Sequence, residues 1–415
     1  MKDMELKEEF EKNLTGYLEN RIILDKRYLD DEQLGPNEKA SILRVLYSHK
    51  IRENEFVKLN QHFAPLFAGN QPYNLCIYGK PGTGKTVTAR VFLGVPSELC
   101  DQRNIPYKIV SLHLGTPKTP FQFLNDLACE LNVSKKYRKG VAHDEFMNKI
   151  IDVLKDFSGY LILLIDEINN IKNDPDPVFQ FLVRRLPTEI NSKLILILIS
   201  NRLDWTDGLD PRVKSFFKKE DIYFRPYNAL DLQTILRLRV EKALNTSLVE
   251  SGVVEKIAAW CSRDHGDARK AVALLAKASQ IAEDRHSPVT LDCIDDAESS
   301  IEIDRYLEAA DTFPKQYQVA FLSIVHGYGK QRNDKITTGE GYEIYVKIAQ
   351  QYHLRPLTQR RYSECLRELD MTGFINMRVV SKGRYGRTAE ISLAVSNDMI
   401  ADKVCERIIN SLEGR

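Results

Sequence analysis

The segment Gly79–Thr86 reads Gly-Lys-Pro-Gly-Thr-Gly-Lys-Thr and has the composition of a phosphate-binding loop. It matches the pattern G-x-x-x-x-G-K-[ST] at every fixed position. Glycines let backbone N–H groups surround an anion, and a helix starting directly afterwards adds the positive end of its dipole. The pattern assigns Lys85 to the β- and γ-phosphates and the Thr86 hydroxyl to Mg²⁺. The predicted chemistry is binding of a nucleoside triphosphate. The loop residues expected to contact it are Gly79, Lys80, Pro81, Gly82, Thr83, Gly84, Lys85, Thr86 and Val87.

Two carboxylates, Asp166 and Glu167, directly follow the apolar run Leu161–Ile165. The run is typical of a buried strand, whose carboxyl end is where open α/β sheets bind ligands. Asp166 is expected to order the water shell of Mg²⁺, and Glu167 to orient and polarise an attacking water. The alternative is a solvated strand end without a role.

Three more polar residues can act on a γ-phosphate. Asn201 ends the apolar run 194–200, and its amide can bond the phosphate or the water. Arg212 follows Asp210-Pro211, where a loop enters a helix, and can serve as an arginine finger on a neighbouring subunit's nucleotide. Arg269 lies at the start of a later helix and can reach the γ-phosphate from there. The alternatives are a turn asparagine, an internal ion pair and a solvated arginine, respectively.

Basic residues gather near the C-terminus in a pattern typical of DNA binding. A hairpin tip around residues 378–387 contains four basic side chains and no acid, and a basic hairpin can enter a minor groove or follow phosphates. The helix expected at 358–371 carries two arginines at its start, where a recognition helix touches base edges. The alternative is a solvated hairpin and surface helix. The predicted DNA contacts are Arg360, Arg361, Arg378, Lys382, Arg384, Tyr385 and Arg387.

The elements that must position these residues are predicted from hydrophobic patterning. Continuously apolar strands suit a parallel sheet covered on both faces, which predicts an α/β nucleotide-binding core over 35–228, with a helical segment at 37–69. No strand pattern occurs over 229–303, so a helical lid is expected there. The expected strands are 74–78, 107–112, 160–165, 193–200 and 221–224, and the expected lid helices include 231–244 and 268–282.

Residues 304–415 change pattern again. Three helices and then a two-stranded hairpin predict a winged-helix domain, a variant of the helix-turn-helix. The N-terminal residues 1–34 are charged and amphipathic, and a helix leading into a linker is expected there. The expected helices of the C-terminal domain are 315–327, 339–353 and 358–371, and its strands are 374–380 and 388–394.

Composition excludes several classes of protein but does not identify the function. The 415 residues are 43% hydrophobic and 28% charged, with a net charge of +1, as in ordinary globular proteins. The basic excess is local, because residues 305–415 carry 17 Lys and Arg against 13 Asp and Glu. Seven scattered cysteines without a C-x-x-C pair indicate reduced thiols, and the histidine spacing predicts no zinc site. No signal peptide or membrane span is expected, so we predict a cytoplasmic, nucleoid-associated protein.

Taken together, the motifs resemble an AAA+ ATPase, and the winged helix narrows the resemblance to the replication initiators shared by archaea and eukaryotes, the origin-recognition and cell-division-control proteins. The resemblance extends over about residues 20–395. Segments that carry it are Leu209–Val213, Arg225–Asn228, Ile235–Arg239, Gly339–Tyr345, Leu357–Arg361 and Ser381–Arg387.

The resemblance implies further residues and partners. Tyr227 and Arg239 match family positions that line the nucleotide pocket; the alternatives are a core aromatic at a strand end and an exposed helix residue. The basic run containing Lys135 and Lys136 matches a family insertion that contacts DNA; the alternative is a solubilising loop. Leu34–Lys39 stands where the family usually has a Pro-His-Arg box, so contacts to the adenine remain unassigned. The implied ligands are ATP or ADP, Mg²⁺ and double-stranded origin DNA. The implied protein partners are paralogous initiator subunits and the replicative helicase.

The function expected on this basis is that of an ATP-dependent replication initiator with slow, switch-like hydrolysis. Three alternatives remain open. A motor or clamp-loading AAA+ ATPase would show brisk DNA-stimulated turnover without site preference. A non-enzymatic DNA-binding regulator would keep its nucleotide permanently. A signalling ATPase that uses its winged helix only for packing would not bind DNA at physiological salt.

Overall fold

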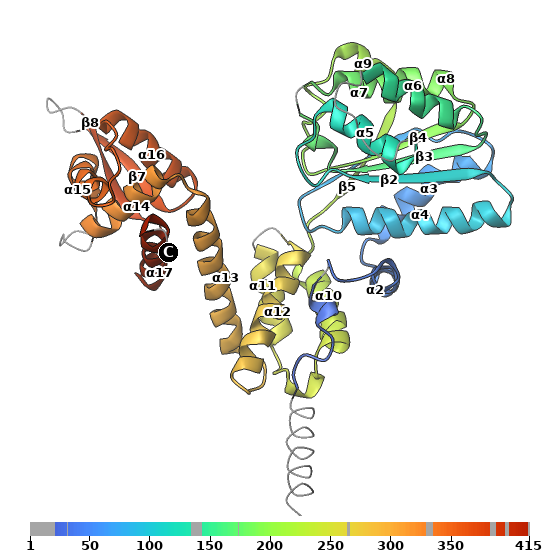
Figure 1. The fold of residues 1–415 in the computed structure, drawn as a ribbon. Coiled ribbons are helices and arrows are strands. Elements are labelled where there is room, and N and C mark those ends of the chain that lie inside the picture. Colours follow the sequence, from blue (N-terminus) through green and yellow to red (C-terminus); the bar gives the residue numbers. More distant parts are fainter. Residues whose placement is uncertain are drawn as a thin grey trace, which may run out of the picture. The chain divides into compact units, whose positions relative to one another are not determined.

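The computed structural model describes residues 21–30, 32–133, 143–172, 174–263, 266–328, 335–381, 387–394 and 398–413 (Figure 1). The chain divides into two compact units, Met1–Ile294 and Asp295–Arg415. The first unit holds a parallel sheet with its covering helices and a helical lid, and the second holds a winged helix.

The sheet of the first unit has five parallel strands in the order β2-β3-β4-β1-β5. All five predicted strands occur, which confirms the predicted α/β core with a parallel sheet. Because β1 lies between β4 and β5, and β3 next to β4, the carboxyl ends of β1, β3 and β4 meet at one edge. The strands are β1 (Asn74–Gly79), β2 (Tyr107–His113), β3 (Tyr160–Asp166), β4 (Lys193–Ser200) and β5 (Lys219–Phe224).

Helices cover both faces of this sheet (Figure 1). Alternate strand residues point to opposite sides. On β3, Ile162 and Leu164 join the core under α3 and α4, whereas Leu161 and Leu163 join the core under α5 to α9. Burial on both sides explains why the strands read as unbroken apolar runs. The helices are α2 (Pro36–Ser48), α3 (Glu53–Phe67), α4 (Lys85–Gln102), α5 (Pro120–Glu130), α6 (His143–Leu154), α7 (Asp176–Gln180), α8 (Leu186–Glu189) and α9 (Pro211–Phe216), with a π-turn η3 (Phe181–Arg185) and a 3₁₀ turn η2 (Ile168–Asn170).

The helical segment predicted at 37–69 is two helices rather than one. Between α2 and α3 the backbone of Lys50 and Arg52 adopts left-handed φ angles of 61° and 66°. The reversal turns α3 onto the sheet and leaves the Arg52 side chain buried, with only 4% of the residue exposed. No glycine or proline lies in the turn between α2 and α3, so hydrophobic periodicity alone did not predict that the helical segment divides there.

The lid consists of α10 (Ala229–Ala243), η4 (Thr246–Leu248), α11 (Val253–Arg263), α12 (Ala268–Asp284) and the start of α13 (Leu291–Thr312). An N-terminal segment that includes η1 (Lys26–Leu29) packs against it. Ile22 and Ile23 are buried, Ile23 forms a bridge with Leu244, and the Leu24 amide donates to the Ala243 carbonyl at 2.7 Å. The described part of the N-terminal region is therefore attached to the lid.

The second unit has the predicted winged-helix arrangement. Buried aromatic residues Tyr345, Tyr362, Phe321 and Phe374 form the centre of its core. The short strand β6 and the helix α17, which closes the domain, were not predicted. The elements are α14 (Lys315–Tyr328), β6 (Ile336–Thr337), α15 (Thr338–Gln351), α16 (Gln359–Met371), β7 (Ile375–Ser381), β8 (Arg387–Leu393) and α17 (Asp398–Glu413), with sheet order β6-β8-β7. Among the described helices, none has the length and apolar character needed to cross a membrane.

Candidate functional site

The predicted phosphate loop joins the end of β1 to the start of α4 and lies directly under the lid. Gly82 and Gly84 adopt left-handed φ angles of 70° and 81°, which favour glycine. A Cβ atom at Gly82 would lie 1.7 Å from Oδ1 of Asp267, and one at Gly84 would lie 2.5 Å from the Tyr227 hydroxyl. The glycines therefore allow both the turn of the loop and the close approach of lid residues.

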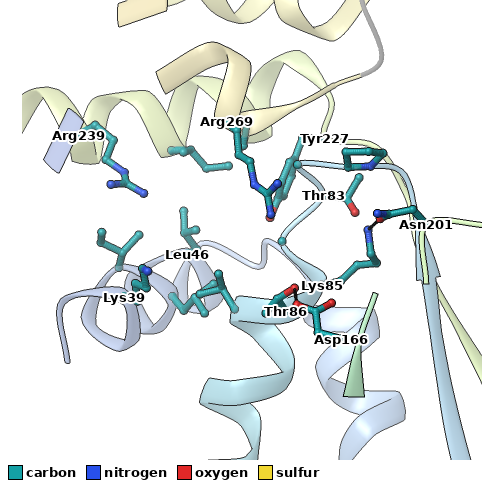
Figure 2. Close-up of a pocket in the computed structure, with 18 of the residues that line it drawn as sticks. Lys39, Leu46, Thr83, Lys85, Thr86, Asp166, Asn201, Tyr227, Arg239 and Arg269 are labelled. Carbon is teal, nitrogen blue, oxygen red and sulfur yellow. Dashed lines mark hydrogen bonds between the residues drawn. The ribbon is translucent and has the colours of Figure 1, made fainter. Parts of the chain in front are cut away.

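Lys85 is held inside the loop. Its Nζ donates hydrogen bonds to the carbonyl oxygens of Gly79 at 2.7 Å and Lys80 at 2.8 Å, and to Oδ1 of Asn201 at 2.7 Å (Figure 2). Burial lowers the pKa of Lys85 to about 8, against the opposing effect of the Asp166 carboxylate. Lys85 and Asn201, which are far apart in sequence, thus meet at the carboxyl edge of the sheet.

The two carboxylates after β3 have different surroundings. Asp166 is 3% exposed, and its Oδ2 accepts from the Thr86 hydroxyl at 2.7 Å and lies 3.1 Å from Nδ1 of His113. Hydroxyl and carboxylate oxygens are the ligands that Mg²⁺ prefers, so this pair fits the ion that the loop motif implies. His113, at the end of β2, was not singled out from the sequence.

Glu167 is oriented by an asparagine that sequence reasoning missed. Its backbone is left-handed, with φ 56°, and its Oε2 accepts a hydrogen bond from Nδ2 of Asn170 at 2.9 Å. Oδ1 of the neighbouring Asn169 accepts hydrogen bonds from the Ser200 hydroxyl at 3.0 Å and from the backbone N–H of Asn201 at 3.3 Å. The turn η2 therefore fixes the ends of both β3 and β4 around the site. The one sequence signal for it is an Asn-Asn pair that begins three residues after a strand.

The lid supplies the opposite wall of the cavity. Asp267 caps α12 by accepting from the Arg269 amide at 2.8 Å, and the Ala268 amide donates to the Gly82 carbonyl at 3.2 Å. Arg269 is exposed and lines the cavity. Arg239 also lines it, is buried, and donates from one terminal nitrogen to the Tyr28 carbonyl at 3.1 Å.

A third wall comes from α2, whose Lys39 and Leu46 lie across the cavity from Arg239 of the lid (Figure 2). Leu43 of α2 and Ile235 of α10 also line the cavity. Apolar residues of α2 and α10 line this part of the cavity, as is typical of small-molecule sites. The sequence left the contacts to the adenine unassigned, and α2 begins within the atypical segment 34–39.

Most of the predicted nucleotide-site residues are brought together, and their roles remain predictions. Gly79 and Lys80 contribute carbonyl oxygens to Lys85, whereas Arg212 is exposed at the start of α9 and does not line the cavity. The predicted residues that line it are Pro81, Gly82, Thr83, Gly84, Lys85, Thr86, Val87, Asp166, Glu167, Asn201, Tyr227, Arg239 and Arg269.

In the winged helix, the predicted arginines Arg360 and Arg361 lie in the first turn of α16. Their side chains are 92% and 73% exposed, respectively. Both approach Glu364, at 3.7 and 3.9 Å. Arg378 is exposed on β7. Arg387 begins β8, but its side chain lies outside the described residues. The other predicted DNA contacts, Lys382, Arg384, Tyr385, Lys135 and Lys136, lie outside the described residues altogether.

A tyrosine cluster holds α16 and the turn before it. The Tyr342 hydroxyl donates to the Leu357 carbonyl at 2.8 Å, and the Leu357 amide donates to the Tyr345 hydroxyl at 3.1 Å. The buried Tyr362 hydroxyl shares a 2.9 Å hydrogen bond with that of Ser323. These bonds fix the turn that positions the exposed arginines.

Three family models match this chain. They are described as an AAA domain, over residues 69–204, a Cdc6 AAA+ ATPase-type lid domain, over 233–299, and a CDC6 C-terminal winged helix domain, over 308–403. The first two fall on the nucleotide cavity and its lid, and the third falls on the domain that carries Arg360 and Arg361.

Relatives match over most of their length. The chain is 37% identical over 359 residues to ORC1-type DNA replication protein 1 of Sulfolobus acidocaldarius, covering 86% of this chain and 88% of that protein. It is 36% identical over 364 residues to the ORC1-type DNA replication protein of Pyrococcus abyssi, covering 86% of each.

Two solved structures are also similar to this chain. The structure of the Aeropyrum pernix ORC1 protein in complex with DNA is 30% identical, with a TM-score of 0.71, covering 94% of this chain and 99% of that one. The Aeropyrum pernix ORC2 protein in its ADPNP–ADP complexes, at 18% identity and a TM-score of 0.55, shares the fold.

Proposed function

This chain belongs to the family of ORC1-type AAA+ DNA replication proteins, and from its site we propose that it is an ATP-switched initiator that binds double-stranded origin DNA. The observation that carries the proposal is that Lys85 donates hydrogen bonds to two carbonyl oxygens of the loop and to Asn201. The loop, the carboxylates after β3 and the first turn of α12 all line one cavity. Such a cavity can respond to the presence of a γ-phosphate.

The chain's residues have separate roles in this proposal. The loop amides bind the phosphates, and Lys85 exchanges its carbonyl partners for phosphate oxygens. Glu167, aimed by Asn170, takes the proton of the attacking water. Asn201 positions that water or the γ-phosphate, and Arg269 brings positive charge from the lid. Thr86 and Asp166 would hold Mg²⁺, which neutralises phosphate charge when bound.

Nucleotide acts here as a ligand that selects between lid arrangements. Its effect is limited by the difference in its affinity for the two arrangements, not by its total affinity. We propose that ATP and ADP stabilise different lid positions and so change DNA binding. Recruitment of the replicative helicase and assembly with paralogous initiator subunits complete the proposed role.

Footprinting on genomic fragments with ATP, with ADP and without nucleotide tests this function. We expect protection at discrete duplex sites whose extent depends on the nucleotide. The Lys85→Ala variant, which lacks the loop ammonium, should give the nucleotide-free pattern under all three conditions. Protection that is absent, or spread evenly over all sequences, would contradict the proposal.

The affinity for ATP is expected to fall above pH 8. Because burial lowers the pKa of Lys85 to about 8 in the nucleotide-free site, whereas bound phosphates favour the charged ammonium, binding takes up a proton above that pH. The dissociation constant should rise up to tenfold per pH unit above pH 8 and be insensitive to this group below it. Titration with a fluorescent ATP analogue from pH 7 to 9.5 measures this, with circular dichroism verifying the fold at each pH. A constant affinity up to pH 9.5 would show that Lys85 is charged before nucleotide arrives.

Changing both Arg360 and Arg361 to alanine is expected to weaken binding to a footprinted duplex at least about 30-fold, since a good base contact contributes about 1–3 kcal/mol. Affinity for a duplex of unrelated sequence should fall less. Fluorescence anisotropy at several salt concentrations measures both. Lys403→Ala, on the exposed surface of α17, is the matched control. Equal losses on both duplexes would assign the arginines to phosphates instead of bases.

A further inference from the structure

Arg52 is a buried, positively charged residue beside the nucleotide site, and it is not one of the described residues that line the cavity. It lies in the turn between α2 and α3, with 4% of the residue exposed. Its position comes from the left-handed backbone described above. Placing a guanidinium there requires several simultaneous partners, because a buried charge without them is strongly disfavoured.

Those partners belong to different parts of the first unit. One terminal nitrogen of Arg52 donates to Oε1 of Glu55 at 3.0 Å, and the other donates to the backbone carbonyl of Thr83 in the phosphate loop at 2.9 Å. The guanidinium carbon lies 4.0 Å from the centre of the Tyr227 ring and 5.3 Å from that of Phe224. Arg52 therefore contacts the loop on one side, and the end of β5 and Tyr227 in the linker after it on the other.

Tyr227 belongs to the linker between the sheet and the lid. β5 ends at Phe224, and α10 begins at Ala229. The Tyr227 amide donates to the Gly266 carbonyl at 3.3 Å, directly before the cap of α12, and its hydroxyl lies against Gly84. A change in the Tyr227 ring position therefore reaches both lid helices that face the cavity.

The buried ion pair with Glu55 is not a strong source of stability, because desolvating two charges offsets most of their attraction. What an arginine adds is geometry. Its planar fork can donate to Thr83 and Glu55 while its face stacks on an aromatic ring, which the point charge of a lysine cannot do. The arrangement specifies a relative position of the loop and the linker.

We propose that Arg52 is a positioning residue that transmits occupation of the phosphate loop to the lid through Thr83 and Tyr227. This inference rests on the proposed nucleotide-binding function. Phosphate fixes the amides of the loop, and that fixes the Thr83 carbonyl and the guanidinium bonded to it. The stacked Tyr227 ring then holds the linker in one orientation. Without Arg52 the loop still binds phosphate, but the lid no longer responds to it in full.

The test compares hydrogen exchange in the loop and in the lid of the full chain, with and without saturating ATP or ADP. In the wild type, nucleotide should slow exchange in peptides from both 79–87 and 229–284. In Arg52→Lys, which keeps the charge beside Glu55 but loses the fork and the stacking, the loop should still be protected. The factor by which nucleotide slows lid exchange should fall about fivefold or more, the usual lower range of coupling between sites.

Two more variants make the result specific. Tyr227→Leu removes the ring under the guanidinium and should reproduce the lid defect. Combined with Arg52→Lys it should add little, because both changes break one contact path. Arg103→Lys is the matched control: this arginine lies over the Phe67 ring at 5.3 Å, at the far end of α4, and its change should leave the lid response intact.

Different results would contradict the role of Arg52 and the proposed nucleotide-binding function. Unchanged lid protection in Arg52→Lys at equal nucleotide occupancy, with Tyr227→Leu also unchanged, would overturn the role of Arg52. A wild-type protein whose loop shows no nucleotide protection would overturn the proposed function itself. Because coupling is reciprocal, the affinity for nucleotide should fall in Arg52→Lys by the same factor as the lid response. Thermal unfolding without nucleotide verifies that both variants fold.

Discussion

Replacing Glu167 with glutamine is expected to lower the rate of ATP hydrolysis about 10²–10⁴-fold, the usual contribution of a general base, while ATP still binds. An amide cannot accept the proton of the attacking water. It can, however, keep a hydrogen bond to Asn170, which now holds Oε2 of the carboxylate at 2.9 Å. Single-turnover hydrolysis of labelled ATP measures the rate, and a fluorescent analogue measures binding.

Glu130→Gln, an exposed carboxylate on α5, is the control for the loss of one negative charge. A Glu167→Gln protein that hydrolyses ATP at the wild-type rate would assign the base elsewhere. One that loses ATP binding would make Glu167 a binding group. The same variant separates the initiator from a regulator with permanently bound nucleotide, because only the initiator should change its DNA occupancy when hydrolysis stops.

Replacing Arg212 with alanine is expected to have little effect on hydrolysis by an isolated subunit and a large effect in an assembly. Arg212 is exposed at the start of α9 and does not line its own subunit's cavity. An arginine finger supplied by a neighbour contributes about 10³–10⁵ in rate. Isolated wild-type subunits should therefore hydrolyse ATP slowly, and assembly on DNA should accelerate them only while Arg212 is present. Lys214→Ala, on the same helix, should preserve the acceleration.

A mixing experiment tests whether Arg212 acts on a neighbour. Arg212→Ala subunits keep an intact Glu167, and Glu167→Gln subunits keep an intact Arg212. If the finger acts between subunits, a mixture should recover part of the assembled rate that neither variant shows alone. No recovery in assemblies shown by light scattering to contain both, or rapid hydrolysis by strictly monomeric wild type, would contradict the role.

The sheet and the winged helix could be predicted because their signals are local. Each buried parallel strand is a continuous apolar run, and the loop motif fixes the connection from β1 into α4. Strand order has no such signal, yet it decides that Asn201 meets Lys85. The exposed α16 arginines were predicted from position alone, whereas the tyrosine hydrogen bonds that hold α16 depend on contacts between separate elements.

Other parts of the site could not be predicted for a related reason. Arg52 is buried only because two residues without a turn signature adopt left-handed angles. Asn169 and Asn170 read as ordinary turn residues until β4 is placed beside β3. The wall that α2 contributes to the cavity depends on how that helix lies against the lid, which no spacing within 36–48 encodes. The basic residues at 135–136 and 382–385 stay predictions.

The attachment of the N-terminal segment to the lid constrains how the cavity can open. Six residues, 30–35, connect η1 to α2, and a fully extended chain of that length spans at most about 20 Å. Through this connection the lid is linked to the α2 wall of the cavity. We expect a lid rotation larger than the slack in this connection to move α2 as well, so that contacts to the base and to the phosphates loosen together. We therefore expect spent nucleotide to lose both sets of contacts in one step.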